Sequence, residues 1–67
     1  MFRLEIDREE DGRWIGEIPA IPGVMAYGAT EAEARMRTEV LALRVIADRI
    51  EHGEPLPPQA RELFVPA

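Results

Sequence analysis

The stretch DGRWIGEIPAIPGVMAYGATEAEA, from Asp11 to Ala34, decides the fold of this 67-residue chain. It begins with Asp-Gly, the dipeptide most typical of a tight hairpin turn. The alternation in RWIGEI predicts a strand at about 13–18, and the short run VMAYG predicts another at about 24–28. Between them stands PAIPG, whose prolines fix φ and whose glycine permits a turn conformation. We expect PAIPG to be an extended link that ends one strand and redirects the chain into the next.

The residues before this stretch complete a hairpin. MFRLEID alternates apolar and polar residues without a break, which predicts a half-buried strand over about 1–7. On the returning strand, Trp14, Gly16 and Ile18 share one face. A glycine inside a strand is typical of a bulge or of a close approach by another part of the backbone.

A long helix is expected over about 31–52. Thr30 is a favourable N-cap, and Glu33 three residues later completes a capping box. Gly53 and Pro55 provide the stop signal. A helix of this extent is about 33 Å long.

The predicted helix carries more apolar surface than one small sheet can cover. A first row follows a 4-3-4-3 spacing and consists of Met36, Val40, Leu43, Ala47 and Ile50. An adjacent row consists of Ala34, Leu41 and Val45, widened by Ala42 and Ile46. Two interpretations remain open: a helix well buried in its own domain, or a helix whose apolar stripe meets a second subunit along one edge.

Length, charge and cysteine content restrict the class of protein. A single domain of this size, here 1–67, buries only about 60% of its unfolded surface, which favours self-association. The absence of cysteine excludes disulfides and thiolate metal sites. A net charge of −5 is unfavourable for nucleic-acid phosphates and suits a basic protein partner. Without a membrane-length apolar run or a signal-peptide pattern, we expect a cytoplasmic protein that does not engage a membrane.

The order and spacing of these motifs resemble the N-terminal domain of HicB-family antitoxins. The matching residues are Asp11, Gly12, Trp14, Pro19, Pro22, Gly23, Gly28, Thr30, Glu33 and Ala34. The resemblance implies an α+β fold of order β-β-β-α-β that looks like a truncated ribonuclease H fold. It comprises a three-stranded antiparallel meander, one long helix and a short fourth strand parallel to the first. The apolar run LFV independently predicts that fourth strand at about 62–65.

The resemblance also implies a partner. HicB antitoxins bind and neutralise HicA toxins, which are small basic ribonucleases, so we expect a non-catalytic domain that occludes the RNA-binding face of such a toxin. Many HicB proteins carry a C-terminal DNA-binding domain that this chain does not match, so we expect no direct nucleic-acid binding. The alternative is a stand-alone structural homo-oligomer without a toxin.

Candidate interaction residues fall into two groups. We expect the acidic tip formed by Glu9, Glu10 and Asp11 to steer a basic partner, with Trp14 and Tyr27 as aromatic anchors. For Trp14 a core position beneath the helix is the competing interpretation. We expect a homodimer or a dimer of dimers, with an interface that consists of Met25, Tyr27, Leu43, Ile46 and Ile50.

No residue is assigned to catalysis, to a cofactor or to a metal. A degenerate ribonuclease-H-like nuclease is the third interpretation, and it requires several carboxylates that converge on metal ions. The only candidates are Glu5, Asp7, Glu39 and Asp48, which we expect on solvent-facing surfaces. The sole histidine, His52, lies in the last predicted helical turn, where a cation interacts favourably with the helix dipole.

Overall fold

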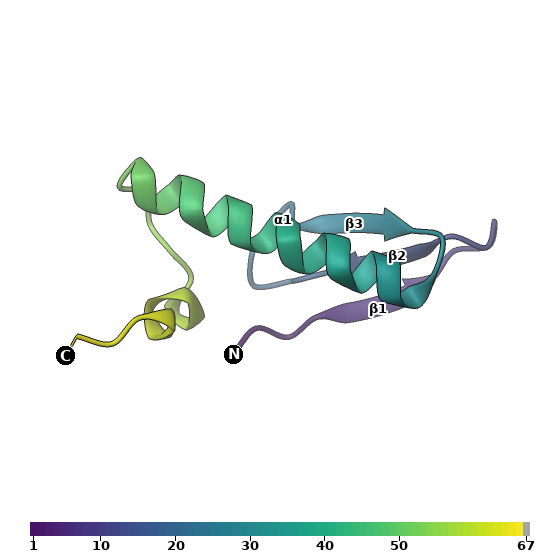
Figure 1. Cartoon of the computed structure of the whole chain (residues 1–67), viewed down its shortest axis with the longest axis horizontal. Coiled ribbons are helices and arrows are strands. Elements are labelled where there is room, and N and C mark those ends of the chain that lie inside the picture. The colour runs from purple at the N-terminus through teal and green to yellow at the C-terminus, as the bar shows by residue number, and fades with distance from the viewer. Residues whose placement is uncertain (67) are drawn as a thin grey trace.

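The computed structural model describes residues 1–66, with one long helix lying across a three-stranded sheet (Figure 1). Ala67, the last residue of the predicted domain, lies outside the described part. The elements are β1 (Glu5–Arg8), β2 (Trp14–Glu17), β3 (Met25–Gly28), α1 (Glu31–Glu51) and a 3-10 helix, η1 (Pro58–Leu63). The sheet has the order β1-β2-β3 and is antiparallel throughout. The predicted α+β class and antiparallel meander are therefore confirmed.

The hairpin between β1 and β2 turns at the predicted Asp-Gly pair. The Glu9 amide donates to the Arg13 carbonyl at 2.7 Å, and the Gly12 amide donates to the Glu9 carbonyl at 3.0 Å. Gly12 has φ +92°, so the loop has the form of a turn followed by a left-handed glycine. The first strand is shorter than the predicted 1–7, because Glu5 pairs with Glu17 and β2 ends at that residue.

The connection from β2 to β3 consists of two consecutive β-turns rather than the extended link predicted from its prolines. The Ile21 amide donates to the Ile18 carbonyl at 3.0 Å, and the Val24 amide donates to the Ile21 carbonyl at 3.1 Å. Pro19 and Pro22 occupy the second position of each turn, where their fixed φ is favourable. Gly23, at φ +87°, takes the third position of the second turn, as a type II turn requires.

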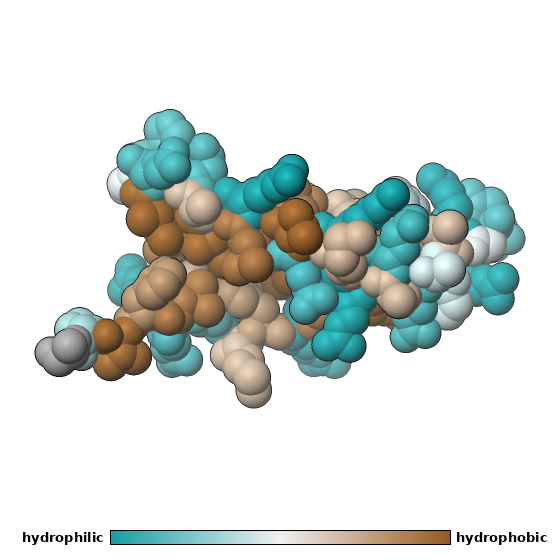
Figure 2. All heavy atoms as spheres, viewed as in Figure 1, coloured by the Kyte–Doolittle hydropathy of each residue, from teal (hydrophilic) through white to brown (hydrophobic). Residues whose placement is uncertain are grey.

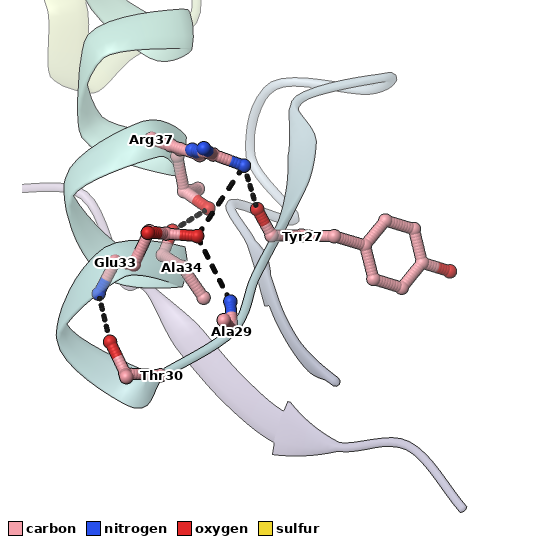
Figure 3. Close-up of polar contacts among 7 residues, drawn as sticks. Tyr27, Ala29, Thr30, Glu33, Ala34 and Arg37 are labelled. Atoms are coloured by element: carbon pink, nitrogen blue, oxygen red, sulfur yellow. Dashed lines mark hydrogen bonds and ion pairs between the residues drawn. The ribbon is translucent and has the colours of Figure 1, made fainter. Parts of the chain in front are cut away.

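Both ends of α1 are capped as predicted. The Glu33 amide donates to Thr30 Oγ1 at 3.1 Å, and Glu33 Oε1 accepts from the Ala29 amide at 3.0 Å (Figure 3). At the other end, Gly53 has φ +65° and its amide donates to the Ile50 carbonyl. The Glu54 amide reaches back to the Arg49 carbonyl at 2.9 Å, which completes a Schellman motif.

The first half of α1 packs closely against the sheet at two glycines, Gly16 and Gly28. A Cβ on Gly16 would overlap Thr38 Oγ1 and would lie 3.1 Å from the Ala34 carbonyl oxygen. A Cβ on Gly28 would lie 2.9 Å from the Ala34 Cα. Ala34 and Thr38 are both fully buried, and Thr38 Oγ1 donates to the Ala34 carbonyl at 2.7 Å. Gly16 thus serves the close backbone approach that its place in the strand indicated.

The hydrophobic core lies beside the sheet, where the two β-turns meet the second half of α1. Its members are Ile18, Ile21, Val24, Ala42, Ile46 and Ala60. Phe2, Leu4, Leu41, Val45 and Leu56 pack around this cluster and are partly buried. The prolines therefore determine the core, because the turns they start point three β-branched residues at the helix.

The 4-3-4-3 row of the helix faces away from the sheet. The buried residues of α1 are Ala34, Thr38, Ala42 and Ile46, which succeed one another every four residues. Two residues of the 4-3-4-3 row, Met36 and Leu43, are 51% and 60% exposed. The interpretation of a helix well buried in its own domain is therefore wrong for this row.

Among the described residues, no helix has the length and hydropathy needed to cross a membrane.

The predicted fourth strand at 62–65 is wrong: the described chain forms the 3-10 helix η1 there instead. Pro57 and Pro58 start this helix, and the Ala60 amide donates to the Pro57 carbonyl at 2.9 Å. Ala60 is buried against α1, which holds the turn in place. Of the predicted strand, only the residues after Leu63 lie outside η1. Two of them, Phe64 and Val65, are 75% and 84% exposed.

Loss of the Thr30 hydroxyl should destabilise the protein. Thr30→Ala leaves the Glu33 amide without its acceptor, so we expect the free energy of unfolding to fall by about 1 kcal/mol. Thermal or urea unfolding measures this change. Thr30→Ser retains the hydroxyl and is the matched control. Equal stability of the alanine variant and the parent protein would show that this hydroxyl does not cap α1.

A side chain at position 16 should push α1 away from the sheet. We expect Gly16→Ala to cost about 1–3 kcal/mol, the usual range for overpacking a well-packed core. Adding Thr38→Ala removes the oxygen that the new Cβ would meet. Urea unfolding of the four proteins of this double-mutant cycle should show the double variant to be more stable than the sum of the two single effects. Strict additivity would contradict the close approach.

Candidate functional site

The side of the sheet that α1 does not cover is the principal candidate surface, and we call it the open face. Its residues alternate with those beneath the helix, and they are Glu5, Asp7, Arg13, Ile15, Glu17, Met25 and Tyr27. The strands bring these side chains into two rows across the sheet. Glu5, Glu17 and Met25 form one row, and Asp7, Ile15 and Tyr27 form the other.

The open face is apolar on its β3 side. Met25 and Tyr27, both on β3, are 46% and 40% exposed. Figure 3 shows the Tyr27 ring pointing away from α1, whereas the Tyr27 carbonyl accepts a hydrogen bond from Arg37 Nη1 at 3.3 Å. Ile15 lies between Asp7 and Tyr27 and is half-buried. An aromatic ring and a methionine exposed together are typical of the centre of a protein interface.

Arg13 joins the hairpin tip to this face. Its Nε lies 2.7 Å from Asp11 Oδ2, and its guanidinium lies 4.3 Å from the centroid of the Tyr27 ring. The Asp11 carboxylate also accepts the Arg13 backbone amide at 3.0 Å. That amide, followed by the guanidinium, lowers the pKa of Asp11 below its usual value, and Asp11 in turn raises the pKa of Arg13.

The acidic residues of the open face have no cationic partner within the described chain. Glu5 and Glu17 stand directly opposite each other on β1 and β2, and Asp7 follows on the same face of β1. The ion pairs found among residues 1–66 involve none of these three carboxylates. Like charges opposite each other across two strands destabilise a sheet. A basic partner would relieve this repulsion.

The predicted partner-binding residues do not form one surface. Glu10 and Asp11 are exposed at the hairpin tip and Glu9 is half-buried there, whereas Tyr27 lies on the open face. Trp14 projects from the opposite, helix-covered side, where the Arg8 guanidinium lies 5.6 Å from the centroid of its ring. Trp14 is half-buried there, and it belongs neither to the core cluster nor to the residues that pack around that cluster.

The predicted oligomer residues divide among three environments. Met25 and Tyr27 belong to the open face, while Leu43 and Ile50 lie on the outward row of α1, with Ile50 49% exposed. Ile46 is 4% exposed and belongs to the core cluster. It therefore stabilises the fold of a single chain and is not accessible to a second one.

The carboxylates required by the nuclease interpretation lie apart. Glu5 and Asp7 project from the open face, on the opposite side of the sheet from α1. On the helix, Glu39 lies 3.7 Å from Arg35, and Asp48 lies 3.3 Å from His52 Nδ1. In the described part of the chain, no three histidine, cysteine or acidic residues are grouped so that they could hold a metal ion.

Sequence reasoning did not assign Arg13, Ile15 or Glu17 to a site. The signal was present in the alternation of the strand, because Ile15 is an apolar residue flanked by charged ones on the face that lies away from the core. No sequence pattern indicates the hydrogen bond from Arg13 to Asp11 or the stacking of the Arg13 guanidinium on Tyr27. They depend on the turn geometry and on the register between β2 and β3.

Comparison with known proteins identifies a relative of full length. The UPF0150 protein Ta0767 of Thermoplasma acidophilum is 30% identical over 67 residues, which cover 98% of this chain and 97% of that protein. No protein-family model matches the chain, and no solved structure matches it.

The pKa of Asp11 provides a test of the contact between the tip and the open face. A pH titration followed by NMR at the carboxyl carbon should give Asp11 a pKa below its usual value. In Arg13→Ala the pKa should rise only part of the way back, because the backbone amide at position 13 remains. Because the folded-state pKa is the lower one, this interaction stabilises the fold above the ordinary pKa. Its contribution disappears as the pH falls through the lowered value.

The control for this titration is Arg35→Ala, which removes a guanidinium from α1 and should leave the pKa of Asp11 unchanged. An unshifted pKa of Asp11 in the parent protein would contradict the bonding described for the hairpin tip.

Proposed function

The chain belongs to the UPF0150 family, and we propose that it is a non-catalytic, HicB-like antitoxin domain. In this proposal it binds a small basic RNA-cleaving toxin of the HicA type and covers the RNA-binding face of that toxin. The observation that carries the proposal is the open face, where an exposed tyrosine and methionine lie beside three carboxylates that form no ion pair within residues 1–66. The resemblance of the sequence from Asp11 to Ala34 to the HicB-family pattern supplies the class of partner.

Charge supports the choice of a basic partner. The chain has a net charge of −5, and three of the four charged residues of the open face are acidic. RNA-binding proteins carry the opposite charge at the surface that contacts phosphates. An acidic surface that covers such a site competes with RNA for the same basic residues, which inhibits cleavage without any chemistry of its own.

The hairpin tip has a separate role in the proposal. Glu10 is exposed at the tip, whereas the charge of Asp11 is already compensated by Arg13. We therefore assign long-range steering of the partner to Glu9 and Glu10, and the short-range contacts to the open face. Arg13 is a positioning residue that holds the Tyr27 ring and the tip in one arrangement.

A stand-alone homo-oligomer is the second candidate function. The observation that favours it is the outward apolar row of α1, which lies on the opposite side of the molecule from the open face. The two candidates are compatible in space, since a copy bound along α1 leaves the open face free.

The decisive experiment is an RNA-cleavage assay with the small basic toxin that the proposal expects to be encoded beside the gene for this chain. We expect the purified chain to inhibit cleavage in a stoichiometric manner. Glu17→Arg should weaken inhibition by about tenfold or more, roughly 1.4 kcal/mol, because a positive charge then faces the basic toxin. The same variant should be slightly more stable than the parent chain, because opposite charges then face each other across β1 and β2.

Glu54→Arg is the matched control. It makes the same change in net charge in the exposed segment after α1, away from the open face, and should inhibit as the parent chain does. Equal inhibition by Glu17→Arg and Glu54→Arg would remove the open face from the proposal. A parent chain that leaves the toxin fully active would overturn the antitoxin function itself.

A further inference from the structure

We propose that the free edge of β1 and the apolar hollow beside it bind an extended segment of a basic partner protein, which adds a strand to the sheet. Apolar side chains of that segment enter the hollow, and the basic side chains between them lie next to Glu5 and Asp7 on the open face. The inference rests on the proposed function for the identity of the partner. It adds which kind of element the partner presents and where that element binds.

The hollow lies on the helix side of the first strand. It exists because α1 packs mainly on β2 and β3, which leaves the helix side of β1 incompletely covered. Its volume is about 240 Å³. Figure 2 shows hydrophobic residues gathered where the second half of α1 approaches the segment after it. The apolar lining of the hollow includes Phe2, Leu4, Ile18, Leu43, Ile46 and Leu63.

The backbone of β1 is available beside this hollow. In an antiparallel pair, alternate residues direct their backbone groups to the partner strand, and the bond from the Glu9 amide to the Arg13 carbonyl fixes which ones do so. The odd-numbered residues of β1 therefore bond to β2, whereas the amides and carbonyls of Ile6 and Arg8 point away from it. Within residues 1–66, no strand lies beside that edge. Free backbone groups of this kind pair with an added strand.

The opposite edge of the sheet is less suitable. The bond from the Ile18 amide to the Val24 carbonyl fixes the alternation between β2 and β3, so the backbone groups of Met25 and Tyr27 point outward. The Tyr27 carbonyl, however, already accepts a hydrogen bond from Arg37 Nη1 at 3.3 Å (Figure 3). A strand added at β3 would have to compete with this bond, which favours the edge of β1.

Charge identifies the chemistry of the added strand. Side chains alternate between the two faces of a sheet, so residues of the added strand beside Ile6 face the hollow and those beside Glu5 and Asp7 lie on the open face. Neither of these carboxylates forms an ion pair within residues 1–66. Two basic residues separated by one apolar residue would pair with both. The segment that fits is therefore an alternation of apolar and basic residues.

The described part of this chain does not supply such a strand. Residues 62–66 hold one acidic and no basic side chain, and Leu63 is held in η1. The first strand of a second copy, paired edge to edge, would bring Glu5 and Asp7 of both copies together, and like charges across two strands are unfavourable. The charges therefore favour a basic partner over this chain's own residues.

An NMR titration with a synthetic peptide tests the site. The probe is a short acetylated peptide that alternates valine with arginine. We expect it to shift the amide signals of Ile6 and Arg8 and the methyl signals of Leu43, and to leave the methyl signal of Met36 unchanged. A peptide that alternates valine with glutamate should bind about tenfold more weakly or less. Equal binding of the two peptides, or shifts confined to other surfaces, would overturn the proposal.

Methylation of the peptide backbone distinguishes strand addition from simple charge attraction. Only alternate amides of an added strand face β1, so one valine–arginine peptide is methylated on the amides of its valines and another on those of its arginines. One of the two should lose binding, because a methylated amide cannot donate to β1, and the other should bind as the unmodified peptide does. The peptide that fails identifies the direction of the strand. Equal binding of the two methylated peptides would contradict strand addition.

Two variants of the chain test the hollow. Leu43→Gln changes a residue of the lining that is 60% exposed, so the fold should be kept, and we expect peptide binding to weaken about fivefold. Met36→Gln is the matched control, because Met36 is 51% exposed on the same helix but does not line the hollow. The control should bind as the parent chain does. Equal affinities of the two variants would remove the hollow from the proposal.

The result is separable from that of the RNA-cleavage assay, because the peptide experiments need no toxin. Peptide binding at the edge of β1 without inhibition of a toxin would support this site and overturn the antitoxin function. Inhibition of a toxin by a chain that does not bind the valine–arginine peptide would overturn this site alone.

Discussion

The contact between α1 and the sheet, made through residues with almost no side chain, is the constraint on which the rest of the structure depends. Gly16 and Gly28 leave room for the helix backbone, and Ala34 and Thr38 are the residues that enter this space. A helix held so closely cannot turn a row of large side chains toward the strands. The close contact with the sheet therefore fixes the rotation of α1 about its axis. That rotation determines which way every other residue of the helix faces.

This orientation of α1 gives the molecule surfaces of different composition. The large core residues come from the two β-turns and meet α1 only beyond the strands, so the sheet is a single layer with one bare side. The bare side collects acidic residues around Tyr27 and Met25, and the outer side of α1 collects the 4-3-4-3 row. The acidic face and the outward apolar row of α1 thus lie on opposite sides of one small domain.

Local signals predicted most of the fold, and longer-range packing accounts for the failures. The hairpin, the strand alternation, the Thr30 cap and the Gly53 stop each depend on neighbouring residues, and each is present in the structure. The orientation of α1 could not be predicted in this way. Hydrophobicity alone favours burial of the row of large residues, whereas the glycines of the sheet leave room only for the row of small ones. The fourth strand failed for a related reason: LFV is apolar enough for a strand, but Pro57 and Ala60 commit the preceding residues to η1. At the open face, only Met25 and Tyr27 were assigned to a contact from the sequence, and the acidic tip lies apart from it.

The absence of a parallel fourth strand from the described sheet has a kinetic consequence. Each strand pairs with its neighbour in the sequence, and α1 packs on the two strands that immediately precede it, so little chain has to be closed into loops before contacts form. Folds dominated by such local contacts cross their folding barrier quickly, whereas parallel pairing across a long connection is slow. The meander and helix can therefore assemble as one short unit, a useful property for a chain with so small a core.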